Sequence, residues 1–451
     1  MTTTTASAPL APGALPVIGH TLSMVRDLLG FFESVRELGP MVRIRLGRTE
    51  AYVVNDPELA AHVQVAGNGV QFDKGGPYFD SFDPILGTGL GAVRAAEHRP
   101  LRNLLRPAFQ PARLADYGEQ FQACARERLG AWRPGQIIDP DQEMNQVMVT
   151  ALARTLFIAP GDRQAVEVFQ RNIPLVLGNL AIRMIIPGAG RLPLPGVIRY
   201  ERARRAIHEA ISLMARRREA DPVDYADLMS LLVPPGRPAQ RSDQDLFHQV
   251  MNFFLGGTET SASVMASALH LLSRHSAVYD KLEAELGRVF PGADPGYDDL
   301  RKLPYLRQVL TEALRMYPPG WIFTRIAVAD TQLGGHDLPR GTGVFFSPYV
   351  LHRDPHVFPE PDRFAPERWD NAPTAAQKKA FMPFGLGARR CIGEAMGMAE
   401  SCMAIAMIVR RWTFQEKPGS RPRPQARMVL HLRGVELVLT SKPQDLQMEQ
   451  K

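Results

Sequence analysis

One cysteine stands in the stretch of the chain whose residue types are best suited to chemistry. Cys391 follows the glycine-rich, doubly basic run Phe384-Gly385-Leu386-Gly387-Ala388-Arg389-Arg390 and precedes an apolar helical pattern. A cysteine at a helix N-terminus meets the positive end of the helix dipole and backbone N–H donors, and both favour the thiolate. Arg389 or Arg390 would add to this effect. The pattern indicates a thiolate that is either a nucleophile or a metal ligand.

A second polar cluster interrupts a long apolar helical pattern that runs from Leu246 to Leu272. The cluster is Gly256-Gly257-Thr258-Glu259-Thr260-Ser261, and Ser242-Asp243-Gln244-Asp245 resembles a capping box at the start of the helix. An acid and several hydroxyls are costly inside a buried helix. Helices kink at such Gly/Ser clusters, and glycine lets a ligand approach closely. A solvated kink would also explain the pattern, but we favour a functional site on a central helix.

Two charged pairs are ambiguous when they are taken alone. His98 and Arg102 are spaced i, i+4 and share one helix face, which is either a solvated basic face or an anion site. Glu312 and Arg315 are spaced i, i+3, as in an ordinary surface salt bridge. The irregular segment 351–369 needs polar anchors for its backbone. Together with Arg368, Glu312 and Arg315 would supply them as a buried triad.

The remaining pattern predicts a mainly α protein with a small β region. We expect a β-hairpin near residues 42–54, helices over most of 112–232, strands at 321–326 and 343–346, and a C-terminal hairpin of 428–432 with 435–439. Residues 72–92 form either a packed surface loop or a pocket wall. The proline-broken apolar stretch 184–195 is either a pocket lid or a loop tucked into the core.

Composition limits the class of protein. The 451 residues are 45% hydrophobic and 22% charged, as in an ordinary soluble globular protein. The formal charge of +6 fits local basic patches better than nucleic-acid binding. Cys124 and Cys402 lie in apolar helical patterns and are expected to be core thiols in a reducing cytoplasm. No apolar run is long enough for a signal segment or a stable membrane insertion.

Four motifs together resemble those of the cytochrome P450 family of heme-thiolate monooxygenases. Phe384-x-x-Gly387-x-Arg389-x-Cys391-x-Gly393 is similar to the heme-binding signature, and the cluster at 256–261 is similar to the oxygen-activating segment. Glu312-x-x-Arg315 and Pro366-Glu367-Arg368-Trp369 match the family's charged triad. A lone Glu-x-x-Arg carries little weight, but the cysteine signature is specific and the motifs occur in the family's order. The resemblance covers nearly the whole chain.

The resemblance implies a single-domain cytochrome P450 fold around a buried heme, over residues 16–445 after a flexible tail at 1–15. It makes Cys391 the iron ligand. It places His98, Arg102, Arg325 and Arg389 at the heme propionates, which need charge-assisted hydrogen bonds. It also places Gly256 and Phe384 against the heme.

The same resemblance implies the chemistry. A thiolate ligand pushes electron density onto iron and favours O–O cleavage. Thr260 is suited to hydrogen-bond dioxygen and Glu259 to gate protons, although a carboxylate there is alternatively a structural partner. The presence of this pair favours a dioxygen route over a peroxide route. Electrons would come from NAD(P)H through a ferredoxin and its reductase. The docking surface, unless these are only solubilising charges, would comprise Arg99, Arg106, Arg390, Arg410 and Arg411.

The expected substrate is an apolar secondary metabolite, as in antibiotic biosynthesis. The segments Phe72-Asp73-Lys74-Gly75-Gly76-Pro77-Tyr78-Phe79, Thr324 to Gly335 and Ser347-Pro348-Tyr349 look similar to bacterial terpenoid oxygenases of the pentalenene type. The pocket candidates are Phe72, Phe79, Phe82, Phe253, Trp321, Ile322 and Phe323. Several of these are alternatively core residues, and for Phe253 the two interpretations are equally good. A macrolide or polyketide is the second substrate class and a fatty acid the third. A heme protein that binds ligands without turnover is the rival function, against which the Glu259-Thr260 pair speaks.

Overall fold

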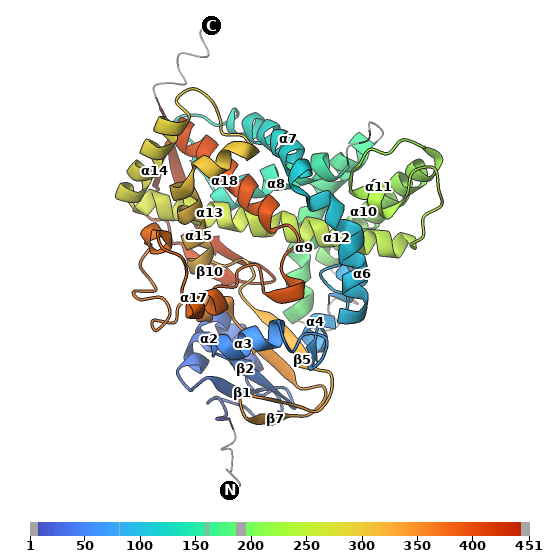
Figure 1. The fold of residues 1–451 in the computed structure, drawn as a ribbon, viewed down its shortest axis with the longest axis vertical. Helices are drawn as coiled ribbons and strands as arrows, with labels where there is room; N and C mark the ends of the chain where they lie inside the picture. Colours follow the sequence, from blue (N-terminus) through green and yellow to red (C-terminus); the bar gives the residue numbers. More distant parts are fainter. Residues whose placement is uncertain (1–7, 81, 158, 160–161, 186–194, 443–451) are drawn as a thin grey trace.

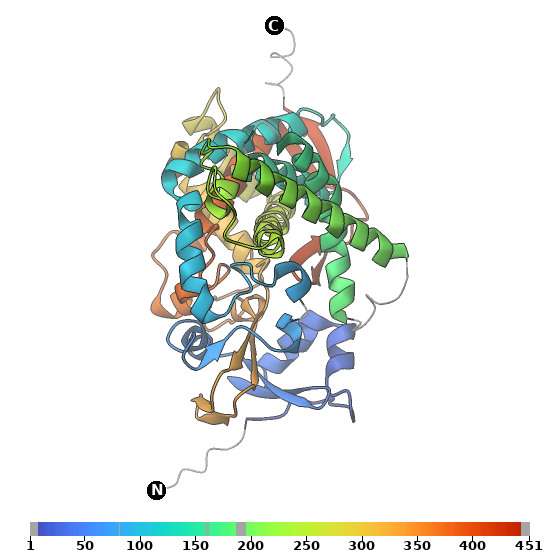
Figure 2. The same ribbon diagram turned by 90° about the vertical axis from the view of Figure 1, so that its right-hand side faces the viewer.

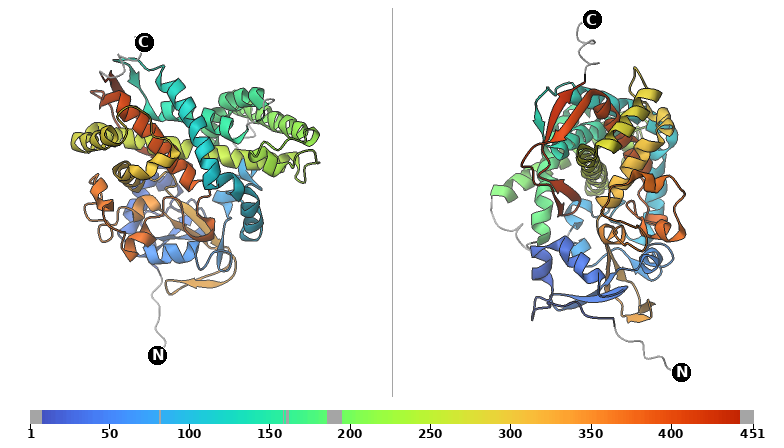
Figure 3. Two further views of the ribbon diagram at one scale, coloured as in Figure 1. Left: turned by 45° about the horizontal axis from the view of Figure 1, so that its top comes forward. Right: turned by 90° about the vertical axis from the view of Figure 1, so that its left-hand side faces the viewer.

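Helices occupy one end of the molecule and the largest sheet occupies the other (Figure 1). This computed structural model describes residues 8–80, 82–157, 159, 162–185 and 195–442. Two further directions of view show the same separation of helices and sheet (Figure 3). The expected mainly α fold with a small β region is therefore confirmed. Most of the apolar stretch at 184–195 lies outside the described residues.

The helices account for most of the described chain. In the first half they are α1 Thr21–Arg26, α2 Leu28–Arg36, α3 Pro57–Gln64, α4 Pro77–Asp80, α5 Asp83–Leu86, α6 Ala95–Leu105, α7 Pro111–Leu129, α8 Pro140–Leu156, α9 Arg163–Ile185 and α10 Pro195–Ala220. In the second half they are α11 Leu228–Leu232, α12 Asp243–Gly257, α13 Glu259–Arg274, α14 Ser276–Val289, α15 Pro304–Met316, α16 Pro348–Leu351, α17 Ala375–Ala380 and α18 Glu394–Arg411.

The central helix is broken where the sequence places its polar cluster. Ser242 and Asp245 form the predicted capping box at the start of α12. The break falls at Thr258, whose φ of −89° and ψ of −67° lie at the edge of the α region. The Thr258 hydroxyl donates to the carbonyl of Phe254 at 2.6 Å, as Ser and Thr do at helix bends. Figure 2 looks almost along α12 and α13 and shows other helices surrounding them.

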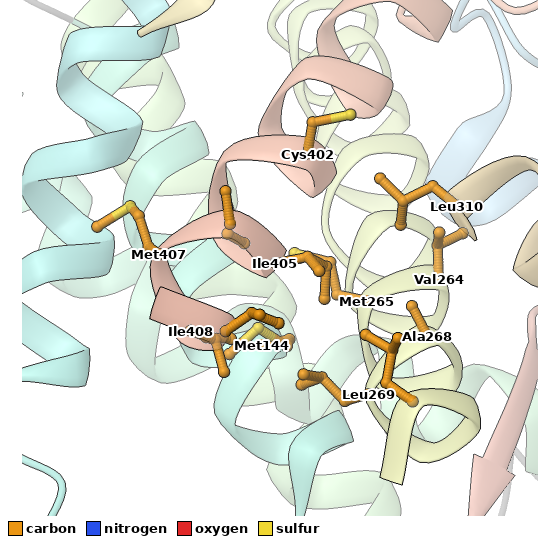
Figure 4. Packing of buried hydrophobic residues seen from close by; sticks show 14 of the residues in the cluster. Met144, Val264, Met265, Ala268, Leu269, Leu310, Cys402, Ile405, Met407 and Ile408 are labelled. Carbon is orange, nitrogen blue, oxygen red and sulfur yellow. The ribbon is translucent and has the colours of Figure 1, made fainter. Parts of the chain in front are cut away.

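The main core lies between α13 and the helices α8, α15 and α18 that pack against it. Figure 4 shows Ile405 of α18 meeting Met265 of α13 between the two helices. Cys402 and Cys124 are 6% and 3% exposed, so both are core thiols as expected. This rigid set of helices fixes the start of α18, and with it the cysteine loop that precedes that helix.

The largest sheet has the strand order β1-β2-β8-β5-β3. Its strands are β1 Met41–Leu46, β2 Thr49–Val54, β3 Phe72–Asp73, β5 Phe323–Ala327 and β8 Gly343–Phe346. β1 and β2 form the predicted hairpin, and β2 pairs with β8 in parallel. β6 Thr331–Leu333 and β7 His336–Leu338 form a small separate hairpin. β3 and β5 bring Asp73 opposite Ile326, next to the predicted propionate residues.

The expected C-terminal hairpin is wrong, because its two strands belong to different sheets. β11 Leu430–Arg433 pairs with β10 Arg423–Ala426, whereas β12 Leu437–Ser441 pairs with β9 Trp412–Glu416 and β4 Ile137–Ile138. The chain crosses between the sheets at Gly434, whose φ is +78°. A side chain there would meet the carbonyl oxygen of Arg421 at 2.6 Å, so glycine is needed.

The described residues before residue 16 include a segment that packs against β1. Residues 1–7 lie outside the described residues, but Ala8 and Ala11 are both 2% exposed. The Ala11 N–H donates to the carbonyl of Arg43 at 2.9 Å, which places residues 8–11 against β1 rather than in a flexible tail. Within the described residues, every helix is too short or too polar to cross a membrane.

Candidate active site

The cysteine loop is held in place by α3. Leu386 donates its N–H to Oε1 of Gln64 at 3.0 Å, and Cys391 donates its N–H to the carbonyl of Phe384 at 2.9 Å. Gly387 has a φ of +65°, and a side chain there would meet the carbonyl oxygen of Gln64 at 3.0 Å. The signature glycine is therefore required by a close approach of two backbones. Gln64 was not predicted from the sequence.

Cys391 opens onto a cavity, but its surroundings do not by themselves produce a thiolate. Burial raises the pKa of the thiol, and the backbone hydrogen bond at Gly393 together with the charges of Arg102 and Arg390 opposes this only in part. The helix start and the arginines act towards the thiolate as expected, and burial acts against them. Metal coordination deprotonates a thiol outright, so this environment suits a metal ligand better than a nucleophile.

Cations gather beside the cysteine loop, where the sequence predicts propionate partners. His98, Arg102 and Arg389 line the cavity, and Arg325 lies behind them and is 4% exposed. Burial lowers the pKa of Arg325 to about 10, and the charge of Arg389 acts in the same direction. Burial, followed by the charge of Arg389, lowers the pKa of His98 to about 4. The cluster is therefore short of negative charge.

Asp73 supplies a single carboxylate to this cluster. Its Oδ1 accepts from Nη2 of Arg389 at 2.9 Å and its Oδ2 accepts from the N–H of Ala95 at 2.8 Å. Within the described residues, Nε of Arg325 and Nε of Arg389 are buried without a hydrogen-bond partner. Buried unpaired donors of this kind call for further acceptors. The arrangement can hold one or more anionic groups at the edge of the cavity.

The broken helix forms the opposite wall of the cavity. Gly256 lies in the last turn of α12 on the cavity side, where a side chain would meet nothing within 4 Å. The Thr260 hydroxyl lines the cavity and donates to the carbonyl of Gly256. Glu259 does not line the cavity and faces β11 instead, where Oε2 lies 4.0 Å from Nε2 of His431. Burial raises the pKa of Glu259, and the charge of His431 opposes that shift.

The cavity, of about 350 Å³, is mainly apolar. Of the predicted pocket residues, Phe253 and Phe323 line it. Phe253 stacks on Phe109 with ring centroids 5.6 Å apart. The apolar side chains of the wall include Leu90, Phe109, Leu152, Leu156, Phe253, Val264, Pro319 and Phe323.

The other five predicted pocket residues do not line the cavity. Phe72 is 0% exposed within a core cluster, where β3 buries it beneath the sheet. Trp321 packs edge-on against Phe32, and Ile322 belongs to the same cluster. Phe82 belongs to the core under α12. Phe79 lies under Lys74, whose Nζ is 5.4 Å from the ring centroid. Aromatic composition alone does not separate a cavity wall from a core.

Glu312, Arg315 and Arg368 meet against the irregular segment 351–369. Glu312 and Arg315 are both 0% exposed, and Nε and Nη2 of Arg315 each donate to Glu312 at 2.9 Å. Arg368 and Trp369 donate to the same carboxylate at 3.3 and 2.9 Å. Nη1 of Arg315 donates to the carbonyl of His352 at 3.0 Å. The triad thus anchors the irregular segment at the backbone carbonyls that need partners.

A model of the cytochrome P450 family matches residues 9–448. The chain belongs to the cytochrome P450 family. It is a cytochrome P450 monooxygenase, as its cysteine signature predicts. Its similarity to the heme domain of cytochrome P450DA, with a TM-score of 0.83 at 23% identity over 96% of this chain and 98% of the other, shows the same fold.

Three curated relatives from Streptomyces resemble this cytochrome P450 along almost its whole length. Cyclooctatin synthase of Streptomyces melanosporofaciens is 38% identical and covers 93% of each chain. Cyclooctat-9-en-7-ol 5-monooxygenase of the same organism is 35% identical, over 91% of this chain and 90% of its own. Pentalenene oxygenase of Streptomyces avermitilis is 35% identical, over 96% of this chain and 98% of its own.

The residues present fit the heme that a cytochrome P450 uses. Cys391 offers a sulfur ligand inside the cavity, and Phe384, at the start of the same loop, also lines the cavity. The unpaired guanidinium donors of Arg325 and Arg389 suit carboxylates such as heme propionates. Gly256 leaves the opposite wall open.

Sequence reasoning missed two charged residues of this cytochrome P450 cavity. Lys74 lines the cavity and donates to the carbonyl of Gly91, and burial followed by the charges of Arg325 and Arg389 holds its pKa well below the usual value. Glu400 of α18 also lines the cavity, and burial raises its pKa to about 8. An acid inside an apolar helical run is the signal that singled out Glu259, and it would have found Glu400 as well.

Proposed function

We propose that this cytochrome P450 oxidises an apolar terpenoid, most simply by hydroxylating a cyclic hydrocarbon. The observation that carries the proposal is the cavity, which Phe253, Phe323 and aliphatic side chains line between α12 and the cysteine loop. An apolar wall binds a hydrocarbon by removing its surface from water. The relatives' names support the class, since pentalenene is an alkene and cyclooctat-9-en-7-ol is an unsaturated alcohol.

We assign the residues to roles as follows. Cys391 ligates the iron, with Phe384 and Gly256 against the heme. His98, Arg102, Arg325 and Arg389 bind the propionates, and Lys74 adds a further cation on that side. Bound heme supplies the activation of dioxygen. One oxygen atom enters the product and the other leaves as water, which consumes two electrons and two protons.

Thr260 and Glu259 are proposed to deliver those protons. The Thr260 hydroxyl points from the break in the helix into the cavity, where it can pass a proton to dioxygen. Glu259 immediately precedes Thr260 in the chain, and burial raises the pKa of its carboxyl, which favours the protonated form. The apolar wall excludes stray water, which would otherwise deliver protons in the wrong place.

Electrons are proposed to come from NAD(P)H through a ferredoxin and its reductase. Arg99 and Arg106 are exposed near the thiolate side and suit an acidic partner. Arg390 is exposed but already ion-paired with Glu394. Arg410 and Arg411 are part-buried against Asp294 at the far end of α18, so we leave them out of the docking surface.

The test is a spectral titration of the heme protein with pentalenene as a hydrocarbon probe and a macrolide as a polar comparison. We expect the hydrocarbon to shift the heme spin state at micromolar concentration and the macrolide to leave it unchanged. Phe253→Asn should weaken hydrocarbon binding at least tenfold, because it places an amide in the apolar wall. Phe290→Ala, which changes an aromatic residue outside the cavity, is the control. A macrolide that binds more tightly than every hydrocarbon tried would overturn the terpenoid assignment.

A further inference from the structure

A buried polar cluster lies on the side of α13 that faces away from the cavity. Glu259 begins α13, His431 and Arg433 come from β11, and Asp141 lies in the first turn of α8. His431 is 4% exposed and Asp141 is 2% exposed. The hydroxyl of Ser263 donates to the carbonyl of Leu430 at 2.5 Å and ties β11 to α13. Residues of α8 and β11, which are distant in sequence, are thus held beside Glu259 at the start of α13.

Asp141 fixes the direction of the imidazole. Its Oδ1 lies 2.8 Å from Nδ1 of His431, and its Oδ2 forms an ion pair with Nη1 of Arg433 at 2.7 Å. An ionised carboxylate accepts hydrogen bonds, so Nδ1 of His431 carries a hydrogen. The other ring nitrogen, Nε2, is then the one that gains or loses a proton, and it is directed at Oε2 of Glu259 at 4.0 Å.

The pKa values of the Asp141 and Glu259 carboxyls are shifted in opposite directions. Burial opposes ionisation of Asp141, but the hydrogen bond and charge of His431, together with the charge of Arg433, lower its pKa. Burial raises the pKa of Glu259, while the charges of His431, Arg433 and Arg427 oppose that shift and the charge of Asp141 adds to it. Asp139, just before α8, also has a raised pKa, mainly from burial. Asp141 is therefore the fixed anion and Glu259 the acid that can take up a proton.

A titrating partner differs in kind from a permanent cation. The charges of Arg433 and Arg427 act on Glu259 without an ion pair to it, whereas its ion-pair partner is the imidazole of His431. A guanidinium keeps its charge, but an unperturbed imidazole changes its charge between about pH 5 and pH 8. The separation of 4.0 Å is longer than a hydrogen bond, so the two groups exchange a proton only when a side chain turns or a water bridges them. This geometry suits a group that supplies protons repeatedly better than a fixed structural pair.

We propose that His431, oriented by Asp141, is a positioning residue that loads Glu259 with the protons Glu259 delivers through Thr260. The inference rests on the proposed role of Glu259. The imidazolium gives its Nε2 proton to Oε2 of Glu259 and becomes neutral, with Nδ1–H still on Asp141. Glu259 passes a proton towards Thr260 and returns to carboxylate, and solvent restores the proton on His431. Arg433, whose side chain is 37% exposed, marks the side of the cluster nearest solvent.

The test follows the fate of dioxygen in the heme protein without any substrate or partner protein. Electrons are supplied photochemically, and hydrogen peroxide released per dioxygen consumed is measured across pH 5.5 to pH 8.5, in light and heavy water. Slow proton delivery releases peroxide, whereas full reduction with four electrons and four protons gives water. The variants are His431→Gln, Asp141→Asn and Glu259→Gln, with His356→Gln at an exposed position as the matched control.

In the wild-type protein the peroxide fraction should rise with pH, because less of the pair is protonated. His431→Gln should raise that fraction several-fold at neutral pH and flatten its pH dependence. Asp141→Asn should move the profile to lower pH, because the imidazolium loses its stabilising anion. His356→Gln should match the wild type. The ferrous–CO spectrum confirms heme binding in each variant, and Asp141→Asn supplies the shift in pH profile if His431→Gln does not fold.

The variants distinguish the proposed proton role of Glu259 from the proposed role of His431. If Glu259→Gln keeps the wild-type peroxide fraction, the proposed proton role of Glu259 fails. If Glu259→Gln raises it while His431→Gln and Asp141→Asn keep the wild-type profile and solvent isotope effect, only the role of His431 is overturned.

Discussion

Glu400 offers the sharpest test of the electrostatics in this cavity. Its carboxyl is 3% exposed on α18, and within the described residues its Oε1 has no hydrogen-bond partner. Burial raises its pKa from 4.5 to about 8. The folded chain therefore holds this proton more tightly than the unfolded chain does. The resulting stability is fully present below the unfolded pKa and is lost as the pH rises towards about 8.

The magnitude follows from the two pKa values. One unit of pKa corresponds to about 1.4 kcal/mol, so ionising Glu400 in the folded protein costs on the order of 5 kcal/mol. Between about pH 5 and about pH 7.5, this group should lower the free energy of unfolding by roughly 3 kcal/mol. Glu400→Gln removes the ionisable group and keeps the volume. The stability of the variant relative to wild type should therefore grow by that amount over the same range.

The assay is urea unfolding at equal heme content, followed by circular dichroism at several pH values. Glu119→Gln makes the same change at an exposed position on α7 and should show a nearly constant difference from wild type. A Glu400→Gln difference that is equally constant between pH 5 and pH 8 would refute the reasoning, because it would mean that the Glu400 carboxyl is not held neutral by burial.

Three further predictions concern the iron ligand, the distal alcohol and the triad. Cys391→Ala should lose the shifted Soret band of the ferrous–CO complex, whereas Cys402→Ala should keep it, because Cys402 lies in the core. Thr260→Ala should release more hydrogen peroxide per dioxygen consumed, and an unchanged yield would count against its proton role. Arg315→Met should lower the free energy of unfolding by about 3–5 kcal/mol in urea, because the carboxylate of Glu312 remains buried without its main partner. Arg363→Met, at a surface pair, should change it by less than about 1 kcal/mol.

Buried polar sites could be predicted from the sequence where charged or hydroxyl side chains occur in apolar helical patterns, because such side chains are costly to bury. Glu312 and Arg315 were paired by their spacing, and the cluster around Thr260 predicted the break in the central helix. Glu400 satisfies the same criterion and was overlooked. The apolar wall was harder to predict, because Phe253 and Trp321 have the same kind of side chain. Which of them faces a cavity depends on how distant elements pack, and periodicity does not contain that information.

The strand pairing near the C-terminus shows the same limit. Two short apolar runs separated by a glycine are typical of a hairpin. Here the two strands do not pair with each other, because β11 and β12 each pair with strands from other parts of the chain. The carbonyl of Arg421 also lies close to Gly434, where the chain passes from one sheet to the other. His431 was therefore missed as a neighbour of Glu259, since nothing local connects residue 431 with residue 259.

The contacts that hold the cysteine loop have a consequence for how the molecule assembles. Gln64 and Leu386 are separated by 322 residues, and Asp73 and Arg389 by 316. Such contacts close very long loops, and proteins dominated by them fold slowly. During synthesis α8 and α13 can pack against each other early. The loop that carries Cys391 and the core helix α18 that follows it emerge late, and the loop must then return to α3. Heme capture should therefore be a late event in the maturation of this enzyme.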